Sequence, residues 1–285
     1  MLMTHGAAAE IRVVASIAPI HSLVAGVMEG VGEPRLLVRG GASPHSYALR
    51  PSDARALNDA DLIFWVGDGL ETFLPRILGN LGDGAQIVAF MKHPEIRLLE
   101  ARKAGVWEDH DHGGRDPHIW LSPANAKAIA RIAADALKKR DPANREIYVA
   151  NAARVAQRID RMADVIRAHL TPVAHEPFVL FHDSFRYFED AFGLKPLGSV
   201  TVDPERMPGA RRLARLRREV ARLNVKCVLR EPQFTPKTAA MIAEGTNARI
   251  GVVDPLGADL PPGPALYADL MENNARALAA CLSAG

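Results

Sequence analysis

Short apolar runs rich in valine, isoleucine and leucine alternate with longer amphipathic stretches along nearly the whole chain. This alternation is typical of βαβ units built around a mainly parallel sheet. We predict four strands in each half of the chain. They are residues 11–16, 35–38, 62–66, 86–90, 178–181, 197–201, 227–229 and 250–253. The sequence therefore predicts an α/β protein with two lobes of the same class, each holding a sheet flanked by helices.

A long helix is expected between the two halves. From Pro142 to His169 the chain has no glycine, its single proline stands at the start, and its apolar residues mostly recur at helical spacing. With 285 residues the chain also exceeds the usual size of one domain, about 100 to 200 residues. We predict an N-terminal lobe over 1–141, a linking helix over 142–171 and a C-terminal lobe over 172–285. A stiff helical link should keep opening and closing motions small.

We predict the N-cap residues of two helices. Ser52 is a candidate N-cap, followed by Asp53 in the first turn, where a carboxylate suits the helix dipole. Asp183 either orients a neighbouring histidine or caps a helix that begins near Ser184, and we favour the cap.

The balance of charge argues against a nucleic acid partner, and the length of the apolar runs argues against a chain that spans a membrane. The 35 Lys and Arg nearly balance 33 Asp and Glu, so we expect no nucleic acid to bind. The strongly apolar runs fall far short of the roughly 20 residues that span a bilayer.

The first residues bear on where the protein works. A short lead over 1–6 is followed by Ala7, Ala8 and Ala9, small residues that resemble the end of a removed secretory signal. The alternative is an expression scar before a cytosolic domain. Cys227 and Cys281 fit either view, as one disulfide in an exported protein or two thiols in a cytosolic one. We favour export, to the periplasm.

Three of the ten histidines share one kind of position. His45, His118 and His182 each lie at or just after a predicted strand end, and Asp254 directly follows the strand over 250–253. Ligands of open α/β sheets bind at the carboxyl ends of strands. A lone loop histidine is usually a surface residue, so only the combination argues for a site. Because two residues come from each half, a shared metal would lie between the lobes, and three imidazoles with one carboxylate suit Zn²⁺ better than Mn²⁺.

Four motifs make the chain similar to a known family. The segments GASPHSYALRPSDARALNDADLIFWVG, DPHIWLSP, FHDSFRYF and VVDPLG resemble, in order and spacing, those of the cluster A-I substrate-binding proteins. This is the zinc and manganese family of ABC importers, and the resemblance covers nearly the whole chain.

The resemblance implies a metal site and its ligands. It makes His45, His118 and His182 metal ligands and places Asp254 at the position of the carboxylate from the second lobe. A histidine at 182 is similar to the zinc-binding members, since manganese-type members usually have glutamate there. Some zinc members have glutamate just before the first histidine, where this chain has Pro44, and this departure favours Asp254 as fourth ligand. Zinc members also often join the second sheet to the last helix by a disulfide, which implies a Cys227–Cys281 bond.

A short acidic and histidine-rich segment precedes the second ligand. Glu108 to His112, with His110 and His112, looks like a shortened form of the longer loop in many zinc members. It is a candidate for weak secondary zinc capture, and an exposed charged loop is the equal alternative.

These observations together predict a periplasmic, monomeric protein that holds one Zn²⁺ and delivers it to the membrane permease of an ABC transporter. A separate periplasmic protein that supplies the zinc is a further expected partner. One alternative is a manganese or iron protein of the same family. The other is a zinc-dependent hydrolase, although the chain has no HExxH motif and no carboxylate marked as general base. We expect no enzymatic activity.

Overall fold

The computed structural model describes residues 11–82, 84–102, 114–201 and 209–283. The first sheet lies in the N-terminal half and has the strand order β2-β1-β3-β4, with every pair parallel. Its strands are β1 Val13–Ala15, β2 Arg35–Leu36, β3 Leu62–Trp65 and β4 Gln86–Ala89. Strand β3 is buried throughout, as expected for a parallel sheet covered on both faces.

The second sheet repeats this arrangement in the C-terminal half, with the order β6-β5-β7-β8 and only parallel pairs. Its strands are β5 Phe178–His182, β6 Gly198–Thr201, β7 Cys227–Arg230 and β8 Arg249–Val252. All eight predicted strands are therefore present, with no end shifted by more than two residues. The two sheets confirm the predicted α/β class.

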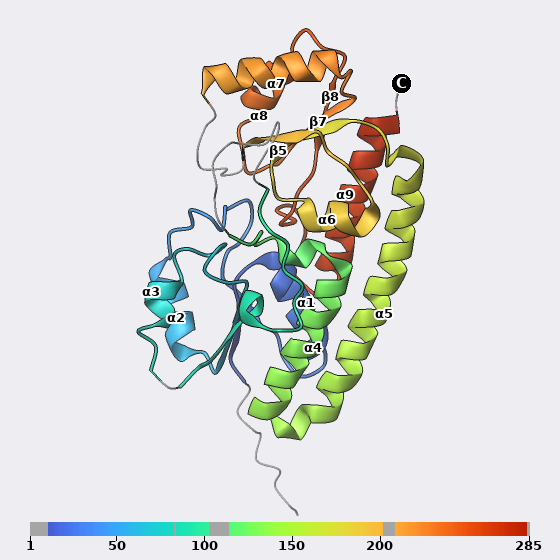
Figure 1. Cartoon of the computed structure of the whole chain (residues 1–285). Coiled ribbons are helices and arrows are strands. Elements are labelled where there is room, and N and C mark those ends of the chain that lie inside the picture. The colour runs from blue at the N-terminus through green and yellow to red at the C-terminus, as the bar shows by residue number, and fades with distance from the viewer. Residues whose placement is uncertain (1–10, 83, 103–113, 202–208, 284–285) are drawn as a thin grey trace, which may run out of the picture.

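Four helices form a layer that runs past both sheets (Figure 1). They are α1 Ala18–Met28, α4 Pro123–Arg140, α5 Arg145–Leu170 and α9 Leu266–Ser283. Helix α5 packs against α4, α1 and α9, and buried side chains of all four belong to one apolar core. Short 3₁₀ turns, Pro142–Asn144 and Thr171–Val173, flank α5. The predicted long helix is thus present, while the lobe boundaries at 141/142 and 171/172 remain a prediction.

Shorter helices cover the outer faces of the sheets, α2 Pro51–Asp59 and α3 Pro75–Leu78 in the N-terminal half and α7 Ala210–Arg222 and α8 Pro236–Ala243 in the C-terminal half. Helix α6 Arg186–Phe192 lies on the inner side of the second sheet, where Tyr187 and Phe188 belong to the core shared with α5 and α9. Single 3₁₀ turns lie at Phe90–Lys92 and Ile119–Leu121. Within the described ranges, no helix has both the length and the hydropathy needed to cross a membrane.

The predicted N-cap of α2 is wrong by two residues. The N-cap is Arg50, with Pro51 in the first turn, and Asp53 accepts a hydrogen bond of 3.1 Å from the Arg50 backbone N–H. Proline favours the first helical position because it has no N–H to leave unpaired and its φ suits the helix. Pro51 therefore starts the helix before Ser52 can cap it.

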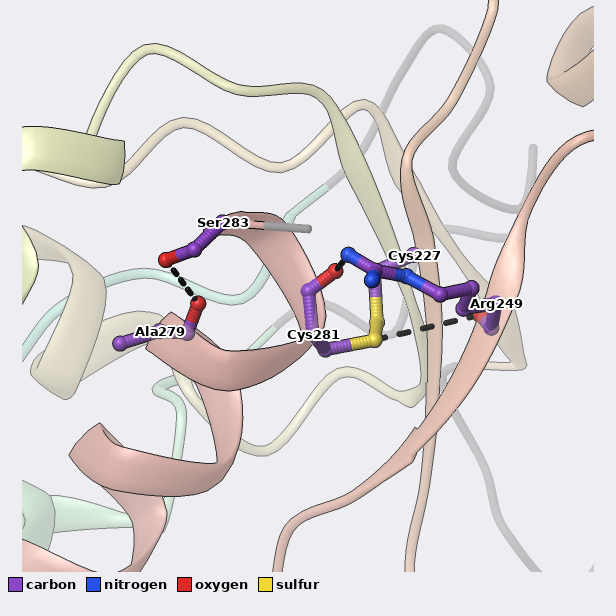
Figure 2. Close-up of a disulfide and its surroundings, with 5 residues drawn as sticks. All are labelled: Cys227, Arg249, Ala279, Cys281 and Ser283. Atoms are coloured by element: carbon purple, nitrogen blue, oxygen red, sulfur yellow. Dashed lines mark hydrogen bonds between the residues drawn. A yellow bond between two sulfur atoms is a disulfide. The ribbon is translucent and has the colours of Figure 1, made fainter. Parts of the chain in front are cut away.

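The disulfide between Cys227 and Cys281 ties β7 to the end of α9 (Figure 2). Arg249 on the neighbouring strand β8 donates to the Cys281 carbonyl. Residues 54 positions apart in the sequence are thereby joined, and the implied bond is confirmed.

Candidate metal centre

The three predicted histidines meet between the two sheets. One ring nitrogen of each of His45, His118 and His182 lies within 4.8 Å of the others, and the ring centroids are 5.0 to 5.7 Å apart. No other group of three or more His, Cys, Asp or Glu residues in the described part of the chain forms such a cluster. Three imidazoles at this separation can converge on one cation.

Each histidine is positioned by a different segment. His45 lies in the loop between β2 and α2, where its carbonyl accepts a 3.2 Å hydrogen bond from Thr72 Oγ1. His118 directly precedes the 3₁₀ turn Ile119–Leu121, and His182 is the last residue of β5. Strand β5 is a central strand of its sheet, and His182 pairs with Thr201 of the neighbouring strand β6.

Asp116 fixes the orientation of the His118 ring. Its Oδ1 accepts from His118 Nδ1 at 2.9 Å and from the His118 backbone N–H at 2.8 Å. With Nδ1 donating, the lone pair of His118 lies on Nε2. Burial, and then the nearby His182, hold the pKa of His118 well below its usual value. The ring is therefore neutral at neutral pH and able to bind a metal without first losing a proton.

Glu231 stands behind His182 in a similar way. Its Oε1 lies 3.4 Å from His182 Nδ1, an ion-pair distance without hydrogen-bond alignment, and accepts from Ser184 Oγ at 2.7 Å. Burial lowers the pKa of His182, but Glu231, Asp183 and Asp116 raise it more, so the net pKa is above the usual value. For His45, burial and then the two other histidines lower the pKa to about 2. The three ligand candidates thus differ in proton affinity.

The cavity at the histidines is small and largely apolar. Its volume is about 10 Å³, which suits one ion or water molecule. Apolar side chains from both halves line it, among them Leu70, Trp120, Phe234 and Leu256. Trp120 Nε1 donates to the Pro255 carbonyl at 2.8 Å and so joins the loop after His118 to the loop after β8. An apolar surround strengthens the interaction of a cation with its ligands.

Asp254 follows β8, as predicted, but its carboxylate accepts hydrogen bonds from residues outside the histidine cluster. Oδ1 accepts from Gln233 Nε2 at 3.0 Å and from Leu256 N at 2.9 Å, and Oδ2 accepts from Ala258 N at 2.5 Å. Its oxygens are not part of the three-histidine cluster. A metal bond from Asp254 would have to replace some of these hydrogen bonds.

The favoured role of Asp183 as a helix cap is wrong. Helix α6 begins at Arg186 and receives no side-chain cap from its N-cap residue, Phe185. Asp183 instead accepts a 2.7 Å hydrogen bond from Arg102 Nη1, and Arg102 also pairs with Glu189. A partly buried arginine from the first half thus joins two buried carboxylates of the second half, and one of them, Asp183, directly follows His182 in the sequence.

Sequence reasoning missed Asp116 and Glu231. Both had a usable signal: Asp116 lies two residues before His118 in the DPH motif, and Glu231 directly follows β7, another strand end that reaches the site. The predicted secondary loop with His110 and His112 lies outside the described residues.

Comparisons with known proteins identify the family of the chain. The model of the family described as zinc-uptake complex component A, periplasmic, matches residues 13–281. The high-affinity zinc uptake system protein ZnuA of Brucella suis biovar 1 is 40% identical over 305 aligned positions, covering 95% of this chain and 91% of that protein. The ZnuA of Yersinia pestis is 36% identical, with coverages of 96% and 92%. A crystal structure of ZnuA superposes with a TM-score of 0.81 at 26% identity and covers 95% of this chain and 98% of that one. The chain therefore belongs to the ZnuA family of periplasmic zinc-uptake components.

Proposed function

We propose that this protein captures one Zn²⁺ between its two lobes and delivers it to the permease of an ABC transporter. The observation that carries the proposal is the convergence of His45, His118 and His182 on a cavity of about 10 Å³. Neutral imidazoles are borderline ligands that favour Zn²⁺, and the family and its zinc-uptake members support the same metal. The protein acts in the periplasm, and we also propose a separate protein that donates zinc to it as a partner.

Asp254 remains the proposed fourth ligand. Zn²⁺ in closed sites takes four ligands, and Asp254 is the carboxylate that the sequence places at the same interface. Binding would require Asp254 to leave Gln233 or the backbone N–H groups that it now accepts. Water is the competing fourth ligand.

The small cavity argues against hydrolysis. An ester or peptide substrate needs space beside the metal, whereas the lining residues leave room for about one water-sized species. Manganese or iron would be better served by more oxygen ligands than the three imidazoles provide.

The test is a titration of chelator-stripped protein with Zn²⁺ against a chromophoric competitor, with and without excess Mn²⁺. We expect one tight equivalent that manganese does not displace. Variants His45→Ala, His118→Ala and His182→Ala should each weaken binding by more than about 100-fold. His175→Ala, which removes an exposed histidine, is the control and should bind as the unaltered protein does.

Two further experiments test the fourth ligand and the delivery of zinc. Asp254→Ala should weaken zinc binding if the carboxylate is a ligand, whereas unchanged affinity assigns the position to water.

Delivery is tested by zinc uptake into proteoliposomes that hold the transporter of the same organism. Uptake should require the unaltered protein and fail with His182→Ala, and uptake without any binding protein would contradict the delivery role.

A further inference from the structure

Helix α7 concentrates positive charge on the outside of the second sheet. Its 13 residues include six arginines and one glutamate, whereas the whole chain has 35 basic and 33 acidic residues. The basic character is thus local to this helix and not a property of the surface in general.

The apolar side of α7 is buried against the second sheet and α8. Leu216 and Val220 are buried in a cluster with Val179 and Val228 of the sheet and Ile242 of α8. Neighbouring strand residues such as Leu180 and Leu229 point to the other face, into the core shared with α5 and α9. Helix α7 therefore lies on the face of the sheet opposite the long helices (Figure 1).

The opposite side of α7 presents a stripe of arginines. Arg211, Arg215, Arg218 and Arg222 follow one another at spacings of four, three and four, which places them on one helix face. All four are exposed. We name these four residues the arginine stripe, and its length is about 16 Å at 1.5 Å per residue.

Most of the stripe has no partner within the described part of the molecule. Arg222 pairs with Glu219 at 2.6 Å. No described carboxylate lies within 4.0 Å of the guanidinium groups of Arg211, Arg215 or Arg218. Arg211 also lies in the first turn, where the helix dipole disfavours a cation. Among the residues that the structure describes, no ion pair therefore accounts for these three arginines.

We infer that the arginine stripe adsorbs to a membrane surface that carries anionic phospholipids. A guanidinium group binds phosphate oxygens in bidentate fashion, and four to eight basic residues on an amphipathic helix are typical of contact with anionic lipid. A straight row along the exposed face of one helix can contact several phosphates of a flat surface at the same time. Because the apolar side of α7 is buried in the protein, the contact is electrostatic and does not insert into the bilayer.

The inference is independent of zinc binding. Adsorption through α7 would keep the protein close to the membrane that holds its permease and reduce the volume to be searched. The histidine cluster lies at the interface of the lobes and contributes no residue to the stripe.

The experiment measures co-sedimentation of the full chain with vesicles of phosphatidylcholine alone and with vesicles that also contain phosphatidylglycerol. We expect binding only to the second kind at about 0.1 M salt, and loss of binding near 1 M salt, where the Debye length falls from about 10 Å to about 3 Å. The triple variant Arg211→Gln, Arg215→Gln, Arg218→Gln should bind roughly 100-fold more weakly, at about fivefold per arginine.

The control removes three equal charges from another surface by Lys139→Gln, Arg145→Gln and Arg161→Gln, all exposed residues of α4 and α5. It should bind vesicles within about fivefold of the unaltered protein. Circular dichroism and the zinc titration check that both triple variants fold. Absence of binding to the anionic vesicles, equal loss in both variants, or equal binding to phosphatidylcholine alone would overturn the inference. Binding of the stripe to detergent-solubilised permease but not to vesicles would also overturn it and assign the stripe to an acidic protein surface.

Discussion

The Nδ1 atom of His118 lies 2.9 Å from the Oδ1 atom of Asp116, two residues earlier in the chain. The same oxygen accepts the His118 backbone N–H, so one carboxylate holds both the ring and the backbone of this histidine. Burial raises the pKa of Asp116 to about 7, while the hydrogen bond from His118 opposes that shift. A carboxylate placed behind an imidazole fixes its tautomer and makes it a stronger metal ligand.

Replacing Asp116 should therefore weaken zinc binding without removing a proposed ligand. We expect Asp116→Asn to lower zinc affinity by about 10-fold to 100-fold, because the amide accepts the hydrogen bond but lacks the charge. The competition titration measures this loss. Asp160→Asn, which alters an exposed carboxylate paired with Lys127, is the control. If Asp116→Asn and Asp116→Ala both bind zinc normally, Asp116 does not support the site.

Arg102 should be important for stability. It joins Asp183 and Glu189, whose side chains are 3% and 2% exposed. Arg102→Met would leave two buried carboxylates without their partner, and we expect a loss of about 3 kcal/mol in the free energy of unfolding. Arg97→Met, which breaks the exposed pair with Asp190, should cost less than about 1 kcal/mol.

Urea unfolding of the zinc-free variants provides the comparison. Burial raises the pKa of Asp183 and raises that of Glu189 to about 7, against the lowering effect of Arg102. Without Arg102 both acids protonate more readily, so the loss should be smaller at pH 5 than at pH 8. Equal losses for Arg102→Met and Arg97→Met would contradict a structural role for the buried ion pairs.

The disulfide should stabilise the C-terminal half. It joins residues 54 positions apart, and removing it by Cys227→Ala with Cys281→Ala should lower the free energy of unfolding by about 2 to 4 kcal/mol. Urea unfolding under oxidising and reducing conditions measures the effect. Reduction should destabilise the unaltered protein and leave the double variant unchanged. Zinc affinity of the folded variant should stay the same, since neither sulfur belongs to the histidine cluster.

Glu71 should make the stability of the zinc-free protein depend on pH. It is fully buried and accepts from Ser16 Oγ and from the backbone N–H groups of Val66 and Gly67. Burial raises its pKa from 4.5 to about 7, although these hydrogen bonds lower it. Because the folded pKa is the higher one, the contribution of Glu71 is complete below about pH 4.5 and is lost as the pH rises through 7.

Over this range Glu71 alone should lower the free energy of unfolding by up to about 1.4 kcal/mol per pH unit. The measurement is urea unfolding from pH 5 to pH 8 for the unaltered protein and for Glu71→Gln. The difference between the two slopes isolates Glu71 from the other buried acids. Parallel curves would show that Glu71 does not change its protonation on unfolding.

The sequence alone determined the elements of this protein and the position of its candidate ligands along them. Periodicity and β-branched runs are local signals, so the eight strands and the helix over α5 could be recognised without tertiary information. His45 and His182 could be singled out because the carboxyl ends of parallel strands meet at one edge of a sheet. The expectation that His118 also follows a strand end was wrong, because β4 ends at Ala89, and the resemblance of the DPHIWLSP segment identified this residue. The Cys227–Cys281 bond came from resemblance, since two cysteines alone left free thiols open.

Only the tertiary structure decided how the candidate residues are held. Asp183 looked like a helix cap, but Arg102, 81 positions away, reaches it and competes for its carboxylate. Asp254 lies at the expected strand end, yet its oxygens accept hydrogen bonds from Gln233 and from two backbone N–H groups. The partner of a polar side chain depends on which distant groups the fold buries beside it, and local sequence patterns do not contain that information.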